Sequence, residues 1–190
     1  TSDERSWPDI TEKVLFLGTG CTKINRKHIW SKYDFKVVKP LGISMQQKKN
    51  DREFISSIIE QITVDVAREL NVLHSTDQSL RYWNIIIGNW LLQYIKVILN
   101  RYRLIEYVVS KNLANRTIKI ETSDFSFNDV DAISFTYRLN EDYWNHNLYI
   151  ELLKYFPNND IKIIEKYFDR TLLTSKKRKH KTYKHYIKKL

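Results

Sequence analysis

Two adjacent helical patterns, running from about Asp51 to Asn112, constrain the fold of this sequence more than any other feature. In the first segment, about Asp51 to Leu73, apolar residues recur every three or four positions, as on the buried face of an amphipathic helix. Asp51 is its expected start signal. The second segment, about Leu80 to Asn112, is more continuously apolar in its middle, so we expect it to be buried on most sides. Such long helices, with only four glycines and three prolines in 190 residues, exclude a turn-dense β-sandwich or barrel.

Before these helices the sequence predicts a strand–helix–strand unit. Val14–Gly18 is a short apolar run ending in glycine, which is typical of a strand buried in a parallel sheet. A short helix at about residues 25–33 follows, with Asn25 as its expected cap, and Phe35–Lys39 forms a second strand. Units of this kind favour a right-handed crossover and a parallel sheet that helices cover.

After the long helices the pattern alternates again between strands and helices. We expect strands at Thr117–Glu121 and Ala132–Thr136, with Asn128-Asp129 as turn material between them, and a helix from Tyr143 to Phe156. The segment Ile161–Phe168 fits either a strand or a helix. Residues 1–174 are therefore predicted to form a single α/β domain with a Rossmann-like parallel sheet and long covering helices.

The positive charge of the chain is concentrated at its end. The net charge is +10, and residues 175–190 supply eight of these charges without a single acidic residue. We expect this basic tail to be flexible. It is either a mobile chain end or a contact for anionic lipid head groups, RNA or a polyphosphate. Because the rest of the chain is nearly balanced in charge, nucleic acid is not the favoured partner.

Several classes of protein are not expected. The single cysteine, Cys21, leaves no disulfide framework and no structural zinc site. No apolar stretch is long enough to span a membrane, and the first residues lack the pattern of a signal peptide. We therefore expect a soluble cytoplasmic protein.

The first candidate binding residues follow the first predicted strand. Gly18-x-Gly20 resembles a phosphate-binding loop, but Lys23 stands where a dinucleotide fingerprint requires a third glycine. Ligands of parallel sheets nevertheless bind beyond the carboxyl ends of the strands. Arg26 could hold a phosphate or carboxylate there, and His28 could act as an acid or base. The alternative is that both residues lie on the surface of a short helix.

The second candidate group lies in the run His74–Leu92, where Arg81, Trp83 and Trp90 surround a predicted helix start. An arginine beside indole rings suits a sugar or a nucleobase. The alternative is a helix start with aromatic core anchors. A third polar and aromatic cluster, Tyr143–Asn147, also lies at a helix start, where the preceding acidic residues can act as caps.

No metal site is predicted, because the histidines do not share a ligand spacing with nearby acidic residues. His28, His74 and His146 are far apart in the sequence, whereas His180 and His185 lie among cations.

Five segments carry a resemblance to a known family. They are Val14–Gly18, Arg26–Trp30, Ser79–Trp83, Gly88-x-Trp90-Leu91 and Arg101-Tyr102. In this order and at these spacings, over about residues 12–156, the chain resembles the amino-terminal part of a family of transferases. That family is associated with bacterial O-antigen and other surface-polysaccharide biosynthesis. The resemblance implies a glycosyl-type transfer.

The resemblance also implies a GT-B-like scaffold, in which two Rossmann-like halves face each other across an active-site cleft. The chain would be one half, incomplete without a carboxyl-terminal half that holds most of the nucleotide-activated sugar donor. The acceptor would be a glycan or a lipid-linked glycan, at the inner face of the cytoplasmic membrane. No cofactor is expected to bind to this chain alone.

The leading hypothesis joins the candidate residues in one hollow. Its substrate-binding residues are Gly18, Arg26, Arg81, Trp83 and Trp90, and its catalytic residue is His28. The arginines would hold phosphate or carboxylate groups, His28 would activate an acceptor hydroxyl, and the tryptophans would face the sugar. The alternative is a non-catalytic accessory module whose basic tail binds an anionic membrane, a partner protein or RNA.

Overall fold

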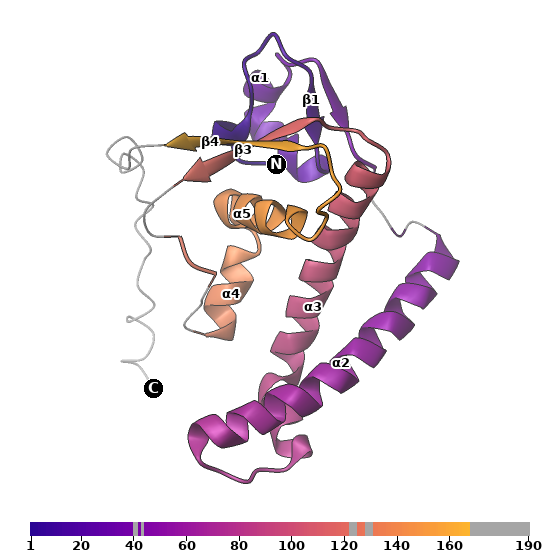
Figure 1. Cartoon of the computed structure of the whole chain (residues 1–190), viewed down its shortest axis with the longest axis vertical. Coiled ribbons are helices and arrows are strands. Elements are labelled where there is room, and N and C mark those ends of the chain that lie inside the picture. The colour runs from indigo at the N-terminus through magenta and orange to yellow at the C-terminus, as the bar shows by residue number, and fades with distance from the viewer. Residues whose placement is uncertain (40–41, 43, 122–124, 128–130, 168–190) are drawn as a thin grey trace.

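The computed structural model describes residues 1–39, 42, 44–121, 125–127 and 131–167. The strand–helix–strand opening is confirmed (Figure 1). Strands β1 (Val14–Phe16) and β2 (Phe35–Val37) pair in parallel, with Val14 opposite Phe35 and Phe16 opposite Val37.

The helix between these strands is shorter than predicted. Helix α1 spans only Lys27–Trp30, and a 3-10 turn of Ile24–Arg26 precedes it. The prediction of Asn25 as the cap is wrong, because this residue lies inside that turn and Arg26 occupies the cap position. The short turn and helix carry Arg26 and His28 just beyond β1.

The two long helices form an antiparallel hairpin that extends away from the strands (Figure 1). Helix α2 spans Met45–His74 and helix α3 spans Leu80–Ser110. The start predicted at Asp51 is wrong, because Ser44 caps α2 by accepting a hydrogen bond from the Gln47 amide. Asp51 instead pairs with Arg103 of α3, so this carboxylate joins the two helices rather than starting one.

The predicted burial of α3 on most sides is also wrong for its first turns. Trp83 and Leu91 are buried, but Ile85 and Ile86 are 72% and 59% exposed. The apolar content of this segment therefore exceeds what a two-helix hairpin can cover, since each helix buries only the stripe that faces its neighbour.

The turn of the hairpin is built around Asn71. Its Oδ1 accepts hydrogen bonds from the Trp83 indole (2.9 Å) and the Gln78 amide (2.9 Å), and its Nδ2 donates to the Gln78 carbonyl (2.9 Å). His74 stacks on the Trp83 ring, and Ser79 caps α3. The polar and aromatic residues around the start of α3 therefore stabilise the turn between the two helices.

The second half of the chain adds two strands and two helices. Strands β3 (Arg116–Glu121) and β4 (Lys162–Tyr167) pair in parallel, so the ambiguous segment Ile161–Phe168 contributes a strand. Helix α4 spans Ala132–Arg138 and helix α5 spans Asp142–Leu153. The turn predicted at Asn128-Asp129 lies outside the described residues.

The strand predicted at Ala132–Thr136 is wrong, because these residues form most of α4. Asp131 caps the helix by accepting a hydrogen bond from the Ser134 amide. Phe135 is buried against Trp144, whereas Ile133 is 68% exposed. A helix of this length packs against the core through a single buried apolar side chain. The alternation of apolar and polar residues in this segment therefore does not reflect a strand with one buried face.

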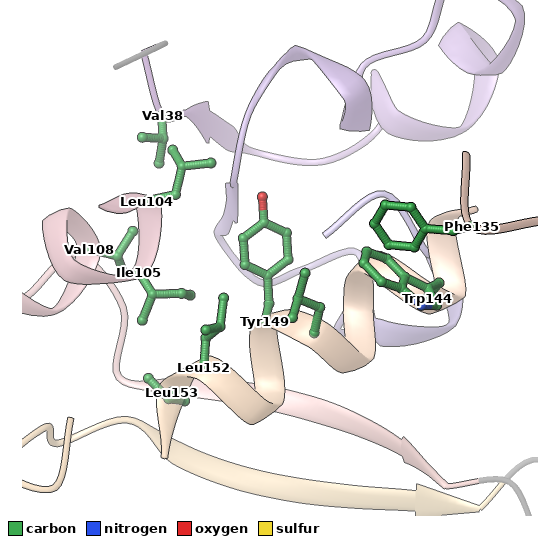
Figure 2. Packing of buried hydrophobic residues seen from close by; sticks show 10 residues of the cluster. Val38, Leu104, Ile105, Val108, Phe135, Trp144, Tyr149, Leu152 and Leu153 are labelled. Carbon is green, nitrogen blue, oxygen red and sulfur yellow. The ribbon is translucent and has the colours of Figure 1, made fainter. Parts of the chain in front are cut away.

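The main core forms around α5, in which nine of twelve residues are buried (Figure 2). Leu152 and Leu153 belong to the same cluster as Leu104 and Ile105 of α3, and Trp144 meets Phe135 of α4 edge to face. Figure 2 shows the side chains of α5 reaching toward α3 on one side and α4 on the other. This helix therefore joins the two halves of the chain.

Within the described residues the four strands form two separate two-stranded parallel sheets. Helix α2 packs along α3 and does not lie over either sheet (Figure 1). The Rossmann-like, GT-B-half classification thus stays a prediction, as does the single domain over residues 1–174.

We predict that Asn71→Ala will lower the free energy of unfolding by about 1–3 kcal/mol, because it leaves the Trp83 indole and the Gln78 backbone groups without their partner. Urea unfolding followed by tryptophan fluorescence measures the loss. Gln61→Ala, an exposed amide on the same helix, is the matched control. Equal stability of the two variants would contradict the role given to Asn71.

Candidate functional site

The segment that follows β1 brings two cations to the carboxyl end of that strand. Gly18 begins it with φ 138°, a backbone conformation that favours glycine. A 3-10 turn of Thr19–Cys21 follows, then Lys23, then the turn that ends in Arg26. Because β1 and β2 are parallel, this segment lies at the edge where ligands of such sheets bind.

Lys23 and Arg26 converge on one carboxylate, Asp142, at the first residue of α5. The Lys23 Nζ lies 2.9 Å from Asp142 Oδ1, and the Arg26 Nη1 lies 3.1 Å from Asp142 Oδ2. Arg26 also lies 3.4 Å from a Glu4 carboxylate oxygen. We call Lys23, Arg26 and Asp142 the basic cluster.

The basic cluster has unused donors on its solvent side. The Lys23 and Arg26 side chains are 41% and 39% exposed, whereas that of Asp142 is 21% exposed. Among the described residues, the hydrogen bonds of Arg26 all use Nη1, so its Nε and Nη2 can meet a ligand. A guanidinium and an ammonium held side by side suit the oxygens of a phosphate or carboxylate group.

His28 lies two residues beyond Arg26, in α1, with an exposed side chain. Its side chain is therefore accessible to solvent and to a ligand bound at the nearby basic cluster. A neutral imidazole can accept a proton from a hydroxyl group.

The structure does not bring the second predicted group to this edge. Arg81 is exposed in the first turn of α3, at the opposite end of the molecule from α1 (Figure 1). Trp83 is buried in the hairpin turn, and Trp90 packs against Tyr94 and Phe135. Gly18, Arg26 and His28 thus lie together, whereas Arg81, Trp83 and Trp90 belong to the hairpin. A hollow shared by all six is not formed.

Sequence reasoning missed a buried polar network next to the basic cluster. Asp3 is 6% exposed and accepts two hydrogen bonds from the Arg5 guanidinium, 2.9 and 2.5 Å long. Burial by itself would raise the pKa of Asp3, but the Arg5 guanidinium outweighs it and lowers that pKa. Arg5 also lies over the Tyr143 ring, 4.8 Å from its centre.

His146 is the centre of this network and is fully buried. Its Nδ1 lies 3.0 Å from the Thr1 hydroxyl oxygen, which in turn lies 3.0 Å from the Ser6 hydroxyl. The pKa of His146 is lowered to about 4, chiefly because burial disfavours the charged imidazolium. The side chain is therefore neutral at physiological pH, and the Tyr143–Asn147 cluster was the sequence signal that could have drawn attention to it.

A cleft of about 950 Å³ opens between the two sheets. Its floor is apolar and includes Ile118, Ile150 and Leu153, while Lys13, Asp34 and Arg116 are among the charged residues at its rim. Residues of β1 and β2 line the cleft, but Lys23, Arg26 and Asp142 of the basic cluster do not. Four basic and four acidic side chains line it, so its charge is balanced and gives no preference for an anion.

The described residues hold no group of three or more histidine, cysteine, aspartate or glutamate side chains that could bind a metal. None of the helices in the described part of the chain is both long and apolar enough to cross a membrane. The basic tail, residues 175–190, lies outside the described residues.

The basic cluster has the hydrogen-bond donors and positive charge to hold an anionic group. Comparison with known proteins identifies the family to which the chain belongs. The whole chain, residues 1–190, matches the family model described as LIC12162 family transferase. The chain therefore belongs to this family of transferases. No curated protein and no solved structure matches it.

We predict that the free energy of unfolding falls as the pH drops from 6.5 to about 4. The unfolded chain binds a proton at His146 near pH 6.5, whereas the folded chain binds it only near pH 4, so folding loses up to about 3 kcal/mol across this window. In spite of burial, the Arg5 guanidinium lowers the pKa of Asp3 below that of a free aspartate, so Asp3 adds its own loss at still lower pH. Urea unfolding across this pH range measures the effect.

His146→Leu is the variant that should flatten this pH dependence, and His28→Gln, at an exposed position, is the matched control that should retain it. A His146→Leu protein with the full wild-type pH dependence would contradict the assignment to His146.

Proposed function

We propose that this chain forms the amino-terminal part of a glycosyl-type transferase in bacterial surface-polysaccharide biosynthesis, O-antigen included. Membership of a transferase family supports the transfer chemistry. The resemblance of residues 12–156 supports the type of group transferred. The observation that carries the proposal is the convergence of Lys23 and Arg26 on Asp142 at the carboxyl end of β1.

In this proposal the basic cluster holds the charged part of a substrate. Lys23 and Arg26 contact phosphate or carboxylate oxygens of the nucleotide-activated sugar donor or of the acceptor. Asp142 is a positioning residue, because it fixes both cations from the start of a buried helix. The turn at Gly18 lets the backbone approach the ligand closely.

His28 is the proposed base. It takes the proton of an acceptor hydroxyl, whose oxygen then bonds to the anomeric carbon of the donor sugar. The bond from that carbon to the phosphate oxygen breaks, and the nucleoside diphosphate leaves with the electron pair. The cations of the basic cluster would stabilise the charge that builds up on the departing phosphate.

The proposal includes a second, carboxyl-terminal half that holds most of the donor, and a glycan or lipid-linked acceptor. Eight lysine and arginine residues in positions 175–190 offer a contact with the anionic inner face of the cytoplasmic membrane. With this contact the enzyme would meet a lipid-linked acceptor where it is made.

We predict that the chain binds inorganic pyrophosphate, the charged group of a nucleotide-sugar donor, and that Arg26→Ala weakens this binding about tenfold or more. Isothermal titration calorimetry measures the affinities. Arg52→Ala is the matched control, because Arg52 is an exposed arginine on α2, away from the basic cluster. Equal affinity of the Arg26→Ala and wild-type proteins, or no binding to wild type, would contradict the proposal.

A further inference from the structure

The outer face of α3 carries apolar side chains that nothing covers in the described part of the chain. Tyr82 precedes Ile85 and Ile86 by three and four residues, and Asn89 follows them by four and three, so these residues share one face. Ile85 and Ile86 are 72% and 59% exposed, and Tyr82 is 43% exposed. We call these four residues the outer α3 patch.

Contacts with the hairpin turn hold Tyr82, the first residue of the patch, in place. Tyr82 meets the edge of the Trp83 ring, with ring centres 5.1 Å apart, and Trp83 is held by Asn71 and stacked by His74. Helix α3 packs on α2, and in the described part of the chain no other helix lies beside its first turns (Figure 1). Two helices leave an apolar face open that a three- or four-helix arrangement would bury.

We propose that the outer α3 patch is the interface of a dimer, in which the α2–α3 hairpins of two copies pack into a four-helix arrangement. The patch is self-complementary under a two-fold axis that crosses α3 between Ile85 and Ile86. With the two α3 helices antiparallel, Ile85 of one copy faces Ile86 of the other. Tyr82 then faces Asn89 of the second copy, so a phenol hydroxyl meets an amide on each side of the axis.

The charges flanking the patch support pairing with a second copy. Asp77 and Lys96 are both exposed, and neither forms an ion pair with any described residue. The same two-fold axis brings Lys96 of one copy toward Asp77 of the other, at both ends of the interface. Between these positions the only other charge is Arg81, which is too little for an anionic membrane or a nucleic acid to recognise.

The patch lies within a long stretch of the hairpin that offers further exposed residues. From Asp77 to Lys96 it spans the last residues of the turn and about half of α3, which has 31 residues and is roughly 46 Å long. A standard interface uses about 20–30 residues from each partner, so the exposed face of α3 has to be joined by other parts of the hairpin. The adjoining exposed residues of the α2 end, Val72 and Leu73, can add to the contact.

Sedimentation velocity over a wide range of protein concentrations tests the proposal on the full chain. Wild type should show a concentration-dependent dimer, and Ile85→Lys should raise its dissociation constant about tenfold or more, because it buries two lysines at the axis. Ile24→Lys, at an isoleucine that is 82% exposed elsewhere, is the matched control. Circular dichroism verifies that both variants remain folded.

A charge exchange tests the proposed geometry. Asp77→Lys alone should weaken the dimer by placing two lysines together, and combining it with Lys96→Asp should restore the wild-type affinity. A monomer at every concentration would overturn the proposal. So would a dimer that Ile85→Lys leaves intact, or binding of wild type to anionic vesicles through Ile85 without self-association.

Discussion

The burial of α5 is the interaction on which the rest of the structure depends. Apart from Asp142, Tyr143 and Glu151, all of its residues are buried, polar ones included. Polar side chains on a helix this deeply buried need hydrogen-bond partners within the protein. Asn145 does so by donating to the Leu139 and Glu141 carbonyls and accepting from Arg101. The bond from Arg101 ties α5 to α3, and the bond to the Leu139 carbonyl ties it to the end of α4. Directed hydrogen bonds therefore fix the position of α5 in addition to apolar packing.

Because α5 is fixed, the candidate site at its first turn is fixed too. Asp142 lies where the helix dipole favours a negative charge, and it holds two cations from a segment more than a hundred residues earlier. These ion pairs are partly exposed, so each contributes only about 0–1 kcal/mol to stability. Their main effect is geometric, since they keep Lys23 and Arg26 together at the carboxyl end of β1.

Local signals were enough to predict the strands β1 and β2, the two long helices and the position of Arg26 beyond β1. Periodicity failed at Ala132–Thr136, where the alternation of residue types predicted a strand but the structure has a helix capped by Asp131. The sequence also did not predict the position of Arg81 correctly. An arginine next to tryptophans in the sequence is compatible both with a binding hollow and with a helix–helix turn. The pairing of Arg26 with Asp142 depends on contacts across the whole chain, which no local pattern encodes.

Hydrogen exchange of the native protein tests the central role of α5 most directly. If α5 is the core helix, the amides of residues 145–153 exchange only through global unfolding, and their protection free energy equals the free energy of unfolding. The first turns of α2, which pack on α3 alone, exchange faster. Exchange of the α5 amides through local opening, as fast as in those turns, would contradict this account.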